Sequence, residues 1–331
     1  MDKRLLALYS AAHFWVDLSC ALLVFRTMAG GADFTLCLLL YNFCAFALQM
    51  PLGLLADRLD RGEAMAGAGC VLAALAYLLP GPLPAAVTAG VGNALFHLGA
   101  GVGVLRGSGG RAAALGVFVS PGALGLYLGT LWGRSGSPAM WTAPLGLLVL
   151  AGAVLRRRQA CPPPPAARPR PMWGLLAPLI LVTALRSYMG FHQSFPWGEG
   201  GWAAALTLAL VLGKAAGGFV LDRLGPERCA LLSLGPAATL YLLSGLPLPG
   251  LLAVFLFNMT MPAALWAAAR ALPEGFAFGA LTFALFLGFL PAYLDWPGTD
   301  GGPLSCAALA LVSLALLWSA LAGLERRGDG C

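Results

Sequence analysis

The chain has 331 residues, of which 59% are hydrophobic and only 10% are charged. A soluble domain carries about 25% charged residues, so this chain has too few to cover a surface exposed to water. Its formal net charge of +6 does not indicate a nucleic-acid partner, because the arginines follow the pattern of membrane topology. The composition excludes a soluble globular protein and predicts one that spans the lipid bilayer many times.

The apolar residues come in runs of about 20, the length of a helix that crosses a bilayer. The connections between the runs are short and often rich in Gly and Pro. We therefore predict an all-α membrane protein with twelve transmembrane helices. Their expected limits are 5–29, 33–56, 63–81, 84–105, 112–132, 138–155, 172–195, 200–221, 229–246, 250–269, 274–294 and 303–323.

Positive charge gathers on one side of the predicted spans. Among the lysines and arginines at the span ends and in the connections, only Arg134 falls on the other side. By the positive-inside rule, the rich side is cytoplasmic. Both termini are then expected in the cytoplasm, as an even number of spans requires, and the predicted location is the plasma membrane.

The first predicted span carries two ionisable residues in the stretch AAHFWVDLSC, residues 11–20. His13 and Asp17 are four residues apart, so they share one face of a helix. Asn93 and His97 repeat this spacing in the fourth span. A charge in the hydrocarbon layer costs about 2.5–3.5 kcal/mol on insertion scales, so such groups gather where water or a partner reaches them. The four residues are candidates for substrate binding or proton coupling, and bracing of helix packing by hydrogen bonds is the alternative.

A proline-rich, cationic segment, RRRQACPPPPAARPRP, divides the chain near its middle. It has no apolar face, so we expect a solvated, extended linker. Spacing and topology are its expected roles, and regulation is the alternative. The predicted parts are an N-terminal six-helix half at 1–155, a cytoplasmic linker at 156–171 and a C-terminal six-helix half at 172–331.

The second half has its own polar residues within the spans. Arg186 lies in the seventh span, and Gln193, seven residues later, is expected on the same face. Lys214 lies in the eighth span and Asn258 in the tenth. Spans 1, 4, 7 and 10 are therefore expected to line a polar path. Asp17 is the one mid-membrane carboxylate that could neutralise the two cations, so an anionic substrate would supply the missing partner, unless the charges form a buried network.

One short motif occurs twice, as GLLADRLDRG and, 165 residues later, as GFVLDRLGPER. Tandem six-helix halves are an architecture of transporters. A carboxylate at such a helix end predicts an electrostatic contact with the dipole of a neighbouring helix. Such a contact would favour one state of a gate over the other. Setting the topology is the alternative role of the arginines. The matched gating candidates are Gly53 with Gly218, Asp57 with Asp222, and Arg58 with Arg223.

The first copy of this motif carries a resemblance. The major facilitator superfamily has G-x-x-x-D-R-x-G-R-R between helices 2 and 3, and this chain has Gly53, Asp57, Arg58 and Arg61 in place, with Asp60 at the second glycine. The sequence therefore resembles that superfamily. AAHFWVD, VGNALFHLGAG and LRSYMGFHQSFPW resemble its fosmidomycin-resistance type of exporter. The resemblance implies two six-helix halves that move a substrate by alternating access.

The chain lacks enzyme signatures such as a phosphate-binding loop, an HExxH motif or a nucleophile elbow, so we expect neither catalysis nor a cofactor. Eight scattered cysteines without a CxxC predict no disulfide framework and no metal site. We expect a monomeric secondary transporter whose partners are protons and a small organic solute or drug, with efflux implied by the resemblance. Alternatives are a proton-coupled uptake symporter for an organic anion, and a non-transporting receptor or lipid-handling protein on the same fold.

Overall fold

The structure is a computed structural model that describes residues 1–157, 171–296 and 301–328, with the side chains of 325–328 excepted. These residues are almost entirely helical, and no strand occurs among them. The predicted linker, 156–171, lies outside the described residues except at its two ends.

The described helices follow the predicted spans in order. Before the linker they are α1 (Lys3–Leu23), α2 (Phe34–Asn42), α3 (Gln49–Leu59), α4 (Gly62–Leu75), α5 (Pro82–Gly107), α6 (Ala112–Arg134) and α7 (Ala143–Leu155). After it they are α8 (Leu176–His192), α9 (Gly201–Leu224), α10 (Pro226–Leu242), α11 (Pro247–Asn258), α12 (Thr260–Ala271), α13 (Glu274–Tyr293) and α14 (Pro303–Gly328). Short π-helical or 3-10 segments extend or join them at Val24–Met28, Phe43–Ala47, Ala76–Leu78, Pro138–Trp141 and Trp173–Leu175.

Ten helical stretches of the described chain are long and apolar enough to cross a membrane. Two other predicted spans, 63–81 and 229–246, correspond to the shorter helices Gly62–Leu78 and Pro226–Leu242. A helix of this length covers about 25 Å at about 1.5 Å per residue, slightly less than the hydrocarbon core of about 30 Å. The chain is a multi-pass membrane protein, and the count of twelve spans stays a prediction.

Contacts between the helices divide the chain into two compact units. Unit 1 comprises Met1–Gly109, Phe118–Ala166 and Glu274–Thr282, and unit 2 comprises the rest. The predicted halves place every helix wholly on one side of the linker. By contacts, however, α6 begins in unit 2 and continues in unit 1, whereas α13 begins in unit 1 and continues in unit 2.

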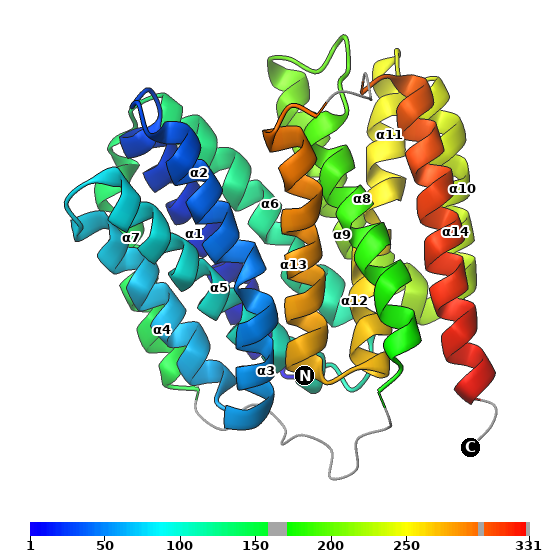
Figure 1. Ribbon diagram of the computed structural model, residues 1–331, viewed down its shortest axis with the longest axis horizontal. Helices are drawn as coiled ribbons and strands as arrows, with labels where there is room; N and C mark the ends of the chain where they lie inside the picture. The colour runs from blue at the N-terminus through cyan, green and yellow to red at the C-terminus, as the bar shows by residue number, and fades with distance from the viewer. Residues whose placement is uncertain (158–170, 297–300, 329–331) are drawn as a thin grey trace. The chain divides into compact units, whose positions relative to one another are not determined.

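Glycines set the packing of unit 1. Here α4 packs against α5 and α7, and α1 packs against the same two helices (Figure 1). A Cβ atom on Gly125 of α6 would overlap the backbone carbonyl of Phe14, and one on Gly129 would overlap that of Leu18. Small residues let helices approach closely in a membrane. The glycines therefore bring α6 directly onto α1, the helix that carries His13 and Asp17.

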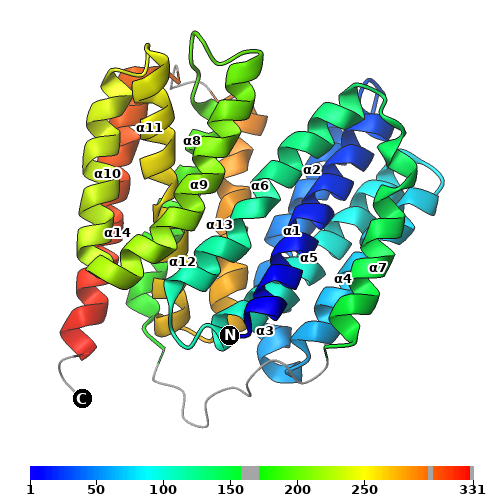
Figure 2. The ribbon, with the colours of Figure 1, turned by 180° about the vertical axis from the view of Figure 1, so that it is seen from behind.

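Within unit 2, α10 packs against α11 and α14, α9 packs against α11 and α12, and α8 packs against α14 (Figure 2). The predicted tenth span is interrupted at Met259, between α11 and α12. Pro262 lies four residues after Asn258 and has no N–H to donate to the carbonyl of that residue. The break therefore lies where the proline removes a helical hydrogen bond.

Candidate functional site

Three ionisable side chains from α1 and α5 meet in the interior of unit 1. Nε2 of His13 lies 3.2 Å from Oδ2 of Asp17, and Nε2 of His97 lies 3.5 Å from Oδ1 of the same carboxylate. Taken as whole residues, His13 and His97 expose only 6% and 8% of their surface. We call His13, Asp17 and His97 the His–Asp–His cluster. It unites the polar faces that the i, i+4 spacing predicted separately on two helices.

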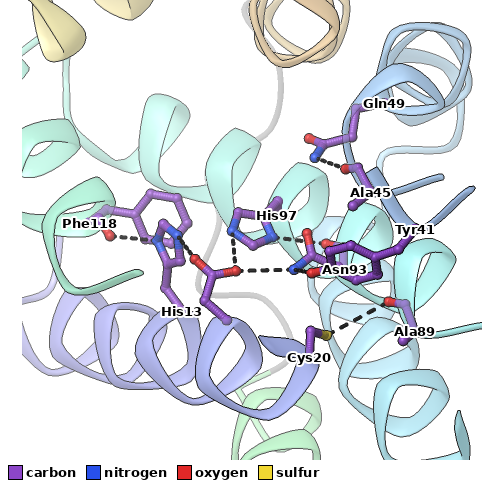
Figure 3. A network of polar contacts seen from close by, with 10 residues as sticks. His13, Cys20, Tyr41, Ala45, Gln49, Ala89, Asn93, His97 and Phe118 are labelled. Atoms are coloured by element: carbon purple, nitrogen blue, oxygen red, sulfur yellow. Dashed lines mark hydrogen bonds and ion pairs between the residues drawn. The ribbon is translucent and has the colours of Figure 1, made fainter. Parts of the chain in front are cut away.

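Asn93 orients the carboxylate of the cluster. Its Nδ2 donates to Oδ1 of Asp17 at 3.0 Å and lies 3.3 Å from the hydroxyl oxygen of Tyr41 (Figure 3). Asn93 is 1% exposed, so these hydrogen bonds are shielded from water. Tyr41 was not among the predicted residues, because it is a single tyrosine in the apolar α2 and only the tertiary fold brings it to Asn93.

Backbone carbonyls fix the two imidazole rings. Nδ1 of His13 lies 2.7 Å from the carbonyl oxygen of Phe118, and Nδ1 of His97 lies 2.9 Å from that of Asn93 (Figure 3). A carbonyl oxygen only accepts hydrogen bonds, so each Nδ1 carries the hydrogen and donates it. Each ring therefore presents Nε2 to Asp17, and that atom holds either a proton or a lone pair.

A glycine of α6 leaves room beside the cluster. A Cβ on Gly122 would overlap both Nε2 of His13 and Oδ2 of Asp17. The ligand atoms of His13, Asp17 and His97 all lie within 4.8 Å of one another, so the structure assembles a group that could hold a metal ion. The sequence analysis expected no metal site because the cysteines are scattered. This group contains no cysteine, and Asp17 and His97 are 80 positions apart in the chain, so no local spacing indicated it.

The predicted polar residues of unit 2 do not form a comparable cluster. Arg186 is half-buried in α8, and its guanidinium has no hydrogen bond or ion pair within the described part of the chain. Lys214 is also half-buried but already has an interaction partner. Asn258 donates Nδ2 to the carbonyl oxygen of Val254, in its own helix, at 2.9 Å. Of the two cations, Arg186 is the one without a polar partner among the described residues.

Gln193 lies outside the helix that carries Arg186. Helix α8 ends at His192, and Gln193 follows with φ −59° and ψ 131°. Its Oε1 accepts a hydrogen bond from the hydroxyl of Tyr241 at 3.1 Å. The expectation that Gln193 shares the helical face of Arg186 is therefore wrong. Pro196 lies four residues after His192 and has no N–H to donate to the carbonyl of that residue, so the helix lacks a hydrogen bond at its end.

The first copy of the repeated motif holds the start of α13. The carboxylate of Asp57 accepts hydrogen bonds from the backbone N–H groups of Gly275, at 3.0 Å, and Phe276, at 2.9 Å. The first turn of a helix has unpaired N–H groups and a partial positive charge. Gly53 permits this approach, because a Cβ there would overlap the carbonyl of Gly275.

The second copy holds the start of α6 in the same manner. The carboxylate of Asp222 accepts from the backbone N–H groups of Ala112, at 2.7 Å, and Ala113, at 2.9 Å. A Cβ on Gly218 would overlap the carbonyl oxygen of Ala112. In both copies, therefore, the aspartate and the glycine serve one contact with a helix N-terminus.

The arginines of the two motifs make no comparable contact. Arg58 and Arg223 are exposed, and neither forms an ion pair within the described residues. Instead Arg106, at the end of α5, pairs with Asp60 and donates through Nε to Oε2 of Glu274 at 3.1 Å. Asp60 has φ +50°, a left-handed conformation that favours glycine. The sequence alone gave no sign of this network, because Arg106 is one of the many arginines at span ends that indicate the cytoplasmic side.

Solved transporters share this fold. FucP, a transporter of the major facilitator superfamily in the outward conformation, is 16% identical with a TM-score of 0.67, over 95% of this chain and 98% of FucP. A variant of FucP from E. coli, described as a fucose:proton symporter, is 16% identical with a TM-score of 0.66, over 95% of this chain and 97% of that one. A bacterial homologue of the iron transporter ferroportin, in an outward-facing state, is 13% identical with a TM-score of 0.64, over 98% and 99% of the two chains.

These structural matches establish the fold. The chain has the fold of the major facilitator superfamily over nearly its whole length. No protein-family profile matches the sequence, and no curated protein matches it. The resemblance to fosmidomycin-resistance exporters therefore stays a prediction.

Proposed function

We propose that the chain is a secondary transporter that moves a small organic anion by alternating access and exports it in exchange for protons. The observation that carries this proposal is the His–Asp–His cluster, which lies within otherwise apolar helices. Ionisable groups are expensive to place inside a membrane and tend to mark substrate or proton pathways. The fold supports transport as well, since the solved proteins that share it are named as transporters.

The contacts of Asp17 support protons as the driving ion. Its two carboxylate oxygens face the Nε2 atoms of His13 and His97. Histidine is the side chain whose charge ordinarily changes between pH 5 and 8. A carboxylate shared by two such rings can take up and release protons without leaving its place, which is the property that a proton-coupled transporter needs.

Arg186 supports an anionic substrate. It is half-buried and has no polar partner in the described residues, and a buried charge without a partner is strongly unfavourable. A guanidinium binds carboxylate and phosphate groups through two parallel hydrogen bonds. The anion would therefore complete an arrangement that the described chain leaves open, with Lys214 as a secondary contact.

The two aspartate contacts support a gating role. Asp57 and Asp222 hold the first turns of α13 and α6, and these are the helices whose first residues group with the opposite unit. Releasing such a contact would free a helix end and leave two N–H groups unpaired. We assign to both aspartates the stabilisation of one state in the transport cycle.

Flux measurements in proteoliposomes test the proposal. A thermal-shift screen of the purified protein against anionic metabolites and antibiotics first identifies a ligand. The proposal predicts that an imposed pH gradient then drives this ligand uphill, and that a protonophore abolishes the movement. Flux that ignores the pH gradient would contradict proton coupling. A ligand that binds but never crosses the membrane would favour a receptor instead.

Uptake by symport is the second candidate function. It is favoured by the fold shared with FucP, one structure of which is described as a fucose:proton symporter. The same proteoliposomes distinguish the two directions. Export predicts that the anion moves against the direction of the protons, whereas symport predicts that both move together.

A further inference from the structure

We propose that the His–Asp–His cluster binds a divalent transition-metal ion, with Nε2 of His13, Nε2 of His97 and the carboxylate of Asp17 as ligands. This goes beyond the proposed function, which requires only protons at the cluster. Zn²⁺ takes nitrogen at about 2.0–2.1 Å and oxygen at about 2.0–2.2 Å, so two ligands of a tetrahedral ion lie about 3.4 Å apart. The N···O separations of 3.2 Å, from His13 to Oδ2 of Asp17, and 3.5 Å, from His97 to Oδ1, are close to this spacing, and the ligand atoms of all three residues lie within 4.8 Å of one another.

The hydrogen bonds of the rings are those of metal-bound histidines. Such a histidine donates its second ring N–H to a carbonyl or carboxylate, which fixes the ring and directs the other nitrogen at the metal. Both rings of the cluster do this, His13 to the carbonyl of Phe118 and His97 to that of Asn93. Two neutral rings would therefore direct lone pairs at the carboxylate of Asp17. A proton on each Nε2 would remove this repulsion one ring at a time, whereas one cation held between the three groups would remove it for both rings at once.

The surroundings of the cluster also suit a metal. Asn93 donates to Oδ1 of Asp17, and outer hydrogen bonds of this kind hold ligating carboxylates in place. Gly122 keeps the space beside His13 and Asp17 free of a Cβ. The side chain of Asp17 is 20% exposed, whereas those of the two histidines are 8% and 11% exposed. Of the three side chains, the carboxylate of Asp17 is therefore the most accessible to an approaching ion.

The donor set specifies the class of metal. Two imidazoles and one carboxylate suit Zn²⁺, Fe²⁺, Co²⁺ and Ni²⁺, whereas Mg²⁺ and Ca²⁺ prefer oxygen ligands alone. Cys20 lies nearby but directs its thiol to the carbonyl of Ala89, at 3.8 Å (Figure 3). The ligand set is therefore nitrogen and oxygen without sulfur.

A titration with Co²⁺ tests the site on the purified full-length chain in detergent, after chelation and desalting. We expect one Co²⁺ per chain with visible d–d absorption, displaced by Zn²⁺ but not by Mg²⁺. His192→Gln is the matched control, because it removes the only other histidine of the chain and should leave binding unchanged. Absence of saturable binding, or a thiolate charge-transfer band, would overturn the proposal.

Variants locate the bound ion. Asp17→Asn and His97→Gln should each weaken Co²⁺ binding at least about tenfold, since even outer-sphere changes have effects of 10- to 100-fold. Gly122→Ala keeps all three ligands but fills the space beside two of them, so it should also lose binding. Unchanged affinity in all three monodisperse variants would place the ion elsewhere and overturn the proposal.

If these variants do not remain folded, wild type decides the matter through heat stability. Zn²⁺ should raise the melting temperature of wild type and of His192→Gln, and a chelator should reverse the rise. No rise in either protein would overturn the proposal. Because neither measurement involves transport, failure to bind metal would leave the proton-coupled function standing, and failure of flux would leave the metal site standing.

Discussion

At the residue scale, Asp17 joins two helices through three side chains. His13 comes from its own helix, and Asn93 and His97 come from α5. Both oxygens of the Asp17 carboxylate have partners, so the loss of its negative charge affects all three neighbouring side chains. Substitution by asparagine removes this charge and nearly keeps the size of the side chain, so it separates the effect of charge from the effect of packing.

Gly122→Ala tests whether the space beside the cluster is needed. The new Cβ would overlap His13 and Asp17, and such overpacking typically costs about 1–3 kcal/mol. We expect a lower apparent melting temperature in detergent. Gly152→Ala in α7 is the matched control, because a Cβ there meets nothing within 4 Å and alanine favours a helix by about 0.5–1 kcal/mol. Equal melting temperatures for the two variants would contradict the role of Gly122.

Arg186→Gln tests the anion site. A hydrogen bond to a charged group contributes about 1.5–3 kcal/mol, so we expect the affinity for an anionic ligand to fall at least about tenfold, measured by equilibrium binding. Lys214→Gln should weaken binding less, because Lys214 already has a partner. Both variants should keep most of their folding stability. A cationic ligand bound equally well by wild type and both variants would refute the anionic substrate.

The cluster could be predicted from the sequence only in part. The four-residue spacing of His13 and Asp17, and of Asn93 and His97, placed each pair on one helical face. The roles of Phe118 and Tyr41 depend on which helices meet, and no local pattern encodes this. The failure at Gln193 has a local cause, the proline that follows the helix.

At the element scale, the ends of α6 and α13 are the informative features. The first backbone N–H groups of each helix donate to an aspartate that lies far away in the chain. Asp57 and Gly275, for example, are 218 positions apart. The apolar runs predicted the middles of the helices, because length and hydropathy are local properties. Capping partners at such separations arise from the tertiary fold, so the repeated motif indicated a helix contact without naming the helix.

Asp57→Ala tests the helix contact in unit 1. It leaves two N–H groups of α13 without their acceptor, and loss of a capping side chain costs about 0.5–2 kcal/mol. We expect a lower apparent melting temperature and a changed rate of substrate exchange. Arg58→Ala is the control, because this exposed arginine forms no ion pair within the described residues. A loss as large in Arg58→Ala would show that the charge of the motif matters more than the cap.

At the scale of the whole molecule, cysteine labelling tests the predicted orientation in the membrane. The six cysteines that the structure describes are buried, so labelling should report Cys161 and Cys331, which lie outside the described residues. An impermeant maleimide should label these two only after cells are opened, because both lie beside arginine-rich segments. Ser135→Cys, exposed next to Arg134, should label in intact cells. Labelling of Cys331 in intact cells would contradict cytoplasmic termini and twelve spans.

We propose that the His–Asp–His cluster couples the movement of an anion to that of protons. The most direct test is to reconstitute wild type and Asp17→Asn, to impose a pH gradient, and to follow the anion and the internal pH together. Asparagine nearly preserves the size of the side chain but removes its ionisable group. We predict that wild type accumulates the anion with opposite proton movement, and that Asp17→Asn exchanges anion across the membrane without accumulation or proton movement. Accumulation and proton movement in Asp17→Asn equal to those of wild type would contradict proton coupling through Asp17.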